Sequence, residues 1–127
     1  MLQDMWGKEI KTVGRGQDFQ RAIARMSIQE YERIRAELRS KLALVEPGKA
    51  TAASWIPGHD WTGTVYEPIY TKACQRNYDA SAMLFGQIFK LEVIHHGALW
   101  STVKQPKHKD DPDGVEIALY WRHADSP

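Results

Sequence analysis

The sequence is poor in cysteine: its 127 residues contain only Cys74. One cysteine cannot form a disulfide within the chain, and it cannot build a zinc site from several thiolates. A chain of this length buries about two thirds of its unfolded surface, so it folds without such cross-links. We therefore expect one domain spanning residues 1–127, and a reducing compartment, the cytoplasm, as its location.

Long hydrophobic runs are also missing. No window approaches the roughly 18 consecutive apolar residues that a membrane-spanning helix needs. The first residues carry acids at Asp4 and Glu9 in place of the apolar core of a secretory signal. The sequence therefore predicts no association with a membrane.

An excess of charge of either sign is nearly absent, with 17 Lys and Arg against 16 Asp and Glu. Arginines do cluster at positions 33, 35 and 39, but Glu32 precedes them and Glu37 lies between the last two. Such interleaving is typical of a solvated helix face with ion pairs three or four residues apart. This pattern argues against nucleic acid as a partner.

Motifs for catalysis or metal binding are missing as well. The chain contains no GxSxG, HExxH, GxGxxG or phosphate-binding loop. His95 and His96 are adjacent, so on a helix their side chains would point about 100° apart and could not share one metal ion. The sequence predicts no catalytic residue, no metal and no cofactor, which favours a non-enzymatic protein and leaves a minor enzyme open.

Helical patterns occupy much of the first 96 residues. Apolar residues between 17 and 26 lie at helical spacing and predict a short helix. Ser27 followed by Glu30 forms a capping box, which predicts a longer helix that ends before Pro47. Residues 64–74 predict a third helix that begins at Thr64 with Glu67 as a second capping box, or else at Pro68.

The next segment, about residues 79–96, is apolar on nearly every side and therefore predicts a helix in the middle of the domain. Asn77 or Asp79 can cap its first turn. Gly86 lies inside this helix at a cost of about 1 kcal/mol relative to alanine. We expect a neighbouring element to pack closely against the missing side chain.

The C-terminal part changes to the alternating pattern of strands. Residues of about 98–105 and 115–123 predict an antiparallel hairpin, with Val115, Ile117, Leu119 and Trp121 on its inner face. Two strands alone are marginally stable, so the hairpin needs the helices, residues 9–13 or another chain as cover. The predicted fold is α+β: three to four helices around a central apolar helix, plus this hairpin, with residues 1–15 irregular, briefly extended or loosely ordered.

Two groups of residues are candidates for binding. Trp100 and Tyr120 are expected on the outer face of the hairpin, where exposed aromatic rings suit an interface. The second group lies in the long connection of residues 47–63, in the stretch SWIPGHDWTG, and comprises Trp55, His59, Asp60 and Trp61. Either these residues line a ligand pocket, or the tryptophans anchor the loop and Asp60 caps the N–H groups of Thr62 and Gly63.

Two functions follow from these patterns. The first is a small protein that works by association, with a second copy or another protein as its partner. The second is a small-ligand-binding protein or minor enzyme whose pocket lies at residues 54–63.

Overall fold

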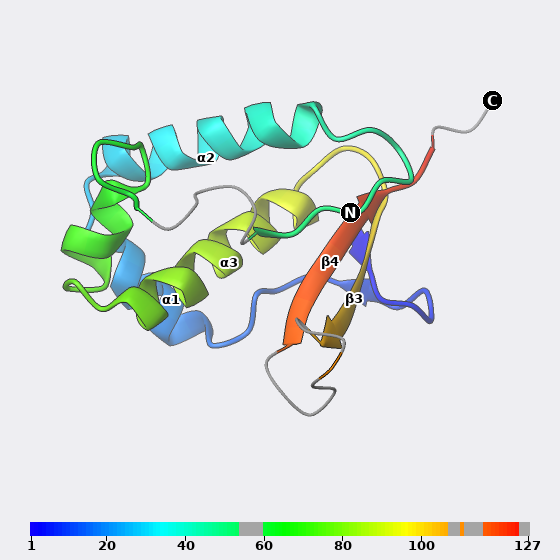
Figure 1. The fold of residues 1–127 in the computed structure, drawn as a ribbon, viewed down its shortest axis with the longest axis horizontal. Coiled ribbons are helices and arrows are strands. Elements are labelled where there is room, and N and C mark those ends of the chain that lie inside the picture. The colour runs from blue at the N-terminus through cyan, green and yellow to red at the C-terminus, as the bar shows by residue number, and fades with distance from the viewer. Residues whose placement is uncertain (54–59, 107–109, 111–115, 125–127) are drawn as a thin grey trace.

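The computed structural model describes residues 1–53, 60–106, 110 and 116–124 (Figure 1). The described residues form an α+β fold, so the predicted class is confirmed. The helices are α1 (Gly16–Ile23), α2 (Ile28–Ala43), η2 (Ile69–Ala73) and α3 (Tyr78–Ile94). The strands are β1 (Leu2–Gln3), β2 (Glu9–Ile10), β3 (Trp100–Pro106) and β4 (Glu116–Arg122).

The sheet is larger than a hairpin. Its order within the described residues is β2-β1-β3-β4. β3 and β4 pair antiparallel, from Trp100 opposite Arg122 to Pro106 opposite Glu116. β1 pairs with β3 in parallel, and β2 pairs antiparallel with β1. Glu9 and Ile10 therefore join the sheet through β1, and not by pairing with the hairpin itself.

The first residues of the chain belong to this sheet, whereas the sequence left them either irregular or briefly extended. Leu2 is completely buried, and the N–H of Trp100 donates to the carbonyl of Met1 at 2.8 Å. The sequence could not reveal this pairing, because a two-residue strand carries no periodicity.

Of the two predicted capping boxes, one is confirmed and the other is wrong. The capping box of α2 is present: Ser27 Oγ accepts the N–H of Glu30 at 3.0 Å, and Glu30 Oε1 accepts the N–H of Ser27 at 2.9 Å. The second capping box is wrong, because Thr64 Oγ donates to the Trp61 carbonyl at 2.7 Å and accepts the N–H of Tyr66. The chain turns there, and the regular helical segment that follows is a short π-helix, η2.

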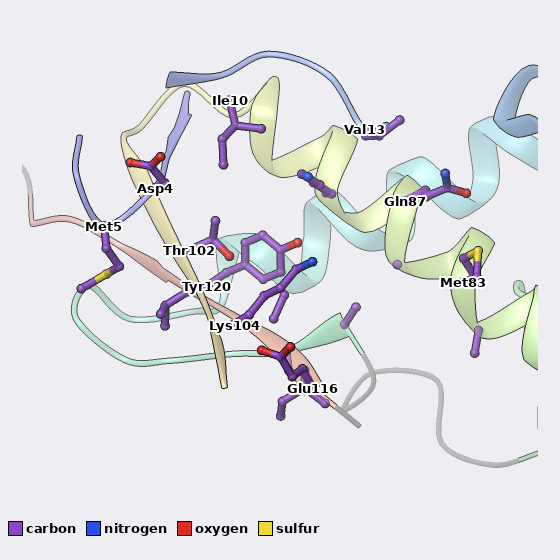
Figure 2. Close-up of a pocket in the computed structure, with 18 of the residues that line it drawn as sticks. Asp4, Met5, Ile10, Val13, Met83, Gln87, Thr102, Lys104, Glu116 and Tyr120 are labelled. Carbon is purple, nitrogen blue, oxygen red and sulfur yellow. The ribbon is translucent and has the colours of Figure 1, made fainter. Parts of the chain in front are cut away.

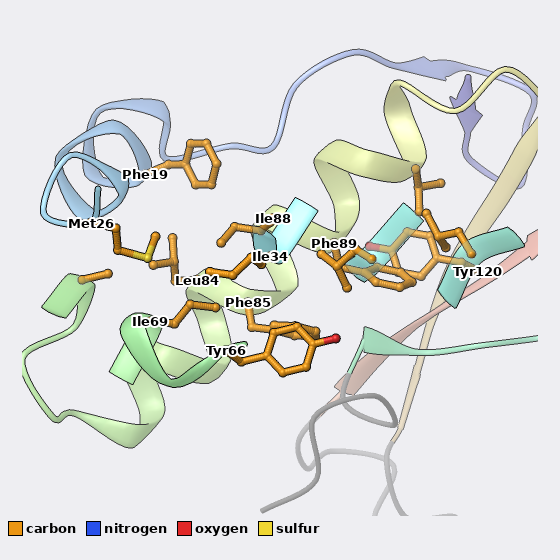
Figure 3. Packing of buried hydrophobic residues seen from close by; sticks show 14 of the residues in the cluster. Phe19, Met26, Ile34, Tyr66, Ile69, Leu84, Phe85, Ile88, Phe89 and Tyr120 are labelled. Atoms are coloured by element: carbon orange, nitrogen blue, oxygen red, sulfur yellow. The ribbon is translucent and has the colours of Figure 1, made fainter. Parts of the chain in front are cut away.

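Helix α3 contributes a large share of the core. Asn77 caps it by accepting the N–H of Ala80 at 3.0 Å. Its buried apolar side chains contact the other helices and the sheet, as Figure 3 shows for several of them. They are Leu84, Phe85, Ile88, Phe89 and Val93.

The two faces of the hairpin are the reverse of those predicted. Trp100 and Tyr120 expose 0% and 5% of their surface, so the expectation that they lie on an exposed interface is wrong. Tyr120 packs edge-on against Phe89 of α3, with 5.1 Å between ring centroids. Alternation separates the two faces of a strand but does not say which one the helices cover. Leu119 and Trp121, predicted inside, are half-buried on the opposite face.

Part of the long connection is tied to the sheet. Thr51 and Tyr120 exchange two backbone hydrogen bonds of 2.7 and 2.8 Å, and Gly48 donates to the Arg122 carbonyl at 2.8 Å. This segment therefore covers one end of the outer edge of β4. Among the described residues, no helix combines the length and the apolar character that crossing a membrane would require.

Candidate functional site

The predicted loop site is described only in part. Trp55 and His59 lie outside the described residues. Asp60 is exposed, and its Oδ1 accepts the N–H of Thr62 at 3.0 Å, which lowers the pKa of the carboxyl group. This is the predicted turn for Thr62, but the N–H of Gly63 donates to Glu67 Oε2 instead, at 2.6 Å.

Trp61 anchors the chain to the core. It is buried, and its ring lies 5.8 Å from Phe85 and 6.2 Å from Tyr78, measured between centroids. Asp60 and Trp61 line a hollow of about 430 Å³ together with Tyr70, Arg76 and other residues. The two described members of the predicted site thus come together, with the ring of Trp61 packed into the core and the carboxylate of Asp60 engaged in a turn.

A larger cavity, which was not among the predicted sites, lies between α3 and the sheet. It measures about 770 Å³, and we call it the α3–sheet groove. Figure 2 shows its walls, formed by α3, by β3 and β4, and by the segment that contains β1 and β2. Most of its lining residues are apolar or small, among them Met5, Trp6, Ile10, Val13, Ala52, Ala53, Ala82, Met83, Gly86 and Ala118.

Gly86 explains why the groove can form beside α3. A Cβ built on this residue would meet no atom within 4 Å, so the expected close packing of a neighbour against Gly86 is wrong. Ala82 lies one turn before Gly86 and also lines the groove. Small residues at this spacing leave a shallow stripe along the helix and space above it.

Two lysines line this apolar cavity. Lys90 on α3 is half-buried, and Lys104 on β3 is exposed and extends towards α3 in Figure 2. The pKa of Lys90 is lowered, first by burial and then by the charge of Lys104. Neither lysine forms an ion pair with another residue in the described parts of the chain.

The carboxylates of the groove are Asp4 and Glu116. Asp4 Oδ1 accepts the N–H groups of Trp6 and Lys8, both at 2.9 Å, and so holds the turn between β1 and β2. Glu116 is exposed at the first position of β4. Neither acid forms an ion pair with the groove lysines.

A serine and a histidine also meet in the structure. Ser101 Oγ lies 2.6 Å from His123 Nε2, and Gln3 Nε2 donates to the same hydroxyl at 3.2 Å. Ser101 exposes only 3% of its surface, which is unfavourable for attack on a substrate. This contact joins β1, β3 and the C-terminal residues.

Cys74 is a further group with potential reactivity in the described part of the chain. Burial raises the pKa of the half-buried Cys74 thiol, which disfavours the nucleophilic thiolate. Among the described residues, no group of three His, Cys, Asp or Glu side chains could hold a metal ion.

The sequence did contain signals for the groove. Gly86 and Lys90 interrupt an otherwise apolar helix, one without a side chain and the other with a charge. Together they mark a stretch of α3 that no element covers completely. The opposite wall comes from strands distant in sequence, so the cavity itself could not be predicted.

Comparison with known protein families, with curated proteins and with solved structures finds no match for this chain.

Proposed function

We propose that this chain is a non-enzymatic cytoplasmic binding module that holds a small apolar molecule in the α3–sheet groove. The observation that carries the proposal is the groove itself, a cavity of about 770 Å³ with a mainly apolar lining. Small-molecule sites commonly occupy about 300–1,000 Å³ and combine an apolar lining with a few polar groups. In this proposed arrangement, α3 is the central helix of the domain and the hairpin packs on one side of it.

The side chains at the rim also support ligand binding. Met5, Trp6 and Met83 all line the groove, and Trp6 exposes 90% of its surface. Exposed large apolar side chains gathered at one cavity mark a site where apolar surface is buried on binding. Methionine has three rotatable bonds, so it adapts its shape to different ligands.

Gly86 provides the sharpest test. In Gly86→Leu, a branched side chain would enter the groove from α3, whereas Gly86→Ala adds a single methyl group to the same backbone. We would titrate both variants and the wild-type protein with the neutral fluorescent dye N-phenylnaphthylamine. The expected result is saturable binding by wild type and Gly86→Ala, and loss of binding by Gly86→Leu.

A circular-dichroism melt of each variant shows whether the fold is retained. Equal dye binding by Gly86→Leu and Gly86→Ala, with both proteins folded, would place the dye elsewhere and contradict the proposed site. Absence of dye binding by the wild-type protein, confirmed with a second neutral probe such as decanol, would contradict the function.

Self-association is the second candidate function, and the outer face of the sheet favours it. Val103 is paired with Leu119, and Trp121 lies two residues further along β4 on the same face. All three are half-buried, and none belongs to the hydrophobic core. A second copy that covered this apolar row would give a symmetric dimer.

Sedimentation equilibrium of the wild-type protein and of Leu119→Lys tests this candidate. A dimer in the wild type that becomes a monomer in Leu119→Lys supports it. Gln105→Lys, on the same face, is the matched control because it adds the same charge without removing an apolar side chain. A monomeric wild type at high concentration would exclude this candidate.

A further inference from the structure

The lysines of the groove indicate which end group the ligand carries. Lys90 is half-buried and lines the mainly apolar α3–sheet groove. An ammonium group in such surroundings normally has a carboxylate beside it, because desolvation of an unpaired charge is costly. Within the described residues, Lys90 has no such partner.

Lys104 makes the local charge more positive. It lies across the groove from α3, on β3, and its charge lowers the pKa of Lys90 in addition to the effect of burial. Among the described residues, no carboxylate contributes an opposing effect on the pKa of Lys90. A bound anion between α3 and β3 would relieve both the desolvation and the repulsion of the two ammonium groups.

The two acids that line the groove do not neutralise Lys90 or Lys104. Asp4 is engaged by two backbone N–H groups in the turn after β1. Glu116 is exposed at the start of β4, and its strand partner is Pro106, two residues beyond Lys104 on β3. In the part of the chain that the structure describes, no acid therefore pairs with the two lysines, and an anion from solution can bind them.

We propose that the ligand of the α3–sheet groove is an elongated apolar molecule with a carboxylate at one end, and that Lys90 and Lys104 bind this carboxylate. This inference rests on the proposed function, since it names the chemical class of ligand for the same site. An ammonium group offers three donors, and hydrogen bonds between ionised partners are stronger than neutral ones.

The groove also indicates where the apolar tail lies. Lys90 and Met83 are two turns apart on α3, which corresponds to about 10 Å along the helix axis. Gly86 lies between them and faces open space. A tail that extends from the lysines towards Met83 would therefore lie across Gly86, along the small-residue stripe of α3.

Decanoate and decanol distinguish the carboxylate from the tail, because they have the same chain and differ in the end group. We would measure their affinities by calorimetry for the wild-type protein, Lys90→Gln and Lys104→Gln. Lys41→Gln on α2, outside the groove, is the matched control. Each groove variant is expected to bind decanoate about tenfold more weakly, as for loss of one charge-assisted hydrogen bond, while its affinity for decanol stays within about twofold.

The possible results separate this inference from the proposed function. Equal affinities for decanoate and decanol, with no effect of Lys90→Gln or Lys104→Gln, would overturn the carboxylate assignment and leave apolar binding intact. Binding of neither molecule by the wild-type protein would overturn both. Equal weakening in Lys41→Gln would show a general effect of net charge and would also overturn the assignment.

Discussion

Arg39 and Glu92 lie 53 positions apart in the sequence, yet Arg39 Nε donates to Glu92 Oε2 at 3.2 Å. Arg35 Nε donates to the other carboxylate oxygen of the same residue. The Glu92 side chain is almost completely buried between α2 and α3. Two arginines of α2 thus bind one carboxylate of α3, and this contact links the two helices.

Replacement of Glu92 should destabilise the fold more than replacement of an exposed acid. Glu92→Gln would leave two arginines facing a neutral amide, and breaking a buried pair typically costs 3–5 kcal/mol. Because both arginines are partly exposed and can be hydrated, we expect a loss of about 2 kcal/mol in the free energy of unfolding, measured in urea. Glu32→Gln, whose side chain is half exposed, should cost less than about 1 kcal/mol. Equal effects of the two substitutions would show that the buried carboxylate of Glu92 contributes no more to stability than an exposed one.

Gly86→Ala should stabilise the protein. The new methyl group meets open space, and alanine is favoured over glycine in a helix by about 1 kcal/mol. The midpoint of urea unfolding should therefore rise. A lower midpoint would show that the space beside Gly86 is filled, as the sequence alone had suggested.

The carboxylate of Glu30 should stabilise the fold in a pH-dependent manner. Its pKa is lowered from the ordinary value of 4.5, first by the ammonium group of Lys72 at 2.8 Å and then by the N–H of Ser27. Since the pKa in the folded state lies below that in the unfolded state, the stabilisation is present above the unfolded pKa and is lost as the pH falls through the folded pKa. Glu30→Gln should thus destabilise at neutral pH and have a smaller effect in acid, measured by urea unfolding. If Glu30→Gln lowered the free energy of unfolding by the same amount at neutral and at acid pH, the ionic role of Glu30 would be contradicted.

Two tyrosines should ionise only at unusually high pH. Burial raises the pKa of Tyr66 and of Tyr120 to about 12. In a spectrophotometric titration, part of the tyrosinate absorbance should appear only at a pH well above 10. This part should be smaller in Tyr120→Phe and in Tyr66→Phe. Because the folded pKa exceeds the unfolded value of 10, the stabilisation is complete below pH 10 and is lost as the pH rises towards 12. Titration of all tyrosines in one step near pH 10, with the protein still folded, would contradict this burial.

Several elements could be predicted because their signals are local. The side chains of Ser27 and Glu30 reach backbone groups within one turn, so their spacing alone identifies the start of α2. Asn77 acts in the same way at the start of α3. The apolar stretch that follows Asn77 predicts a buried helix, and this helix supplies Phe85 and Phe89 to the core.

The candidate site could not be predicted to the same extent. Asp60 was expected to cap a turn, and the contact with Thr62 is local. The partners of Trp61, by contrast, are rings on α3, and the cavity beside Gly86 depends on strands that lie more than ten residues away. Burial of Trp100 and Tyr120 depends on the side of the hairpin on which α3 packs.

The sequence by itself determined the α+β class, the helix that starts at Ser27 and the apolar character of α3, because hydrophobic periodicity and capping act between residues a few positions apart. Only the tertiary structure decided the parallel pairing of β1 with β3, the face of the hairpin that is buried, and the placement of Lys90 and Lys104 along one groove. These features are contacts between distant segments. If a strand shifts its register by one residue, every side chain that pointed to the core points to solvent. The local pattern of alternation is the same in both arrangements, so it cannot distinguish them.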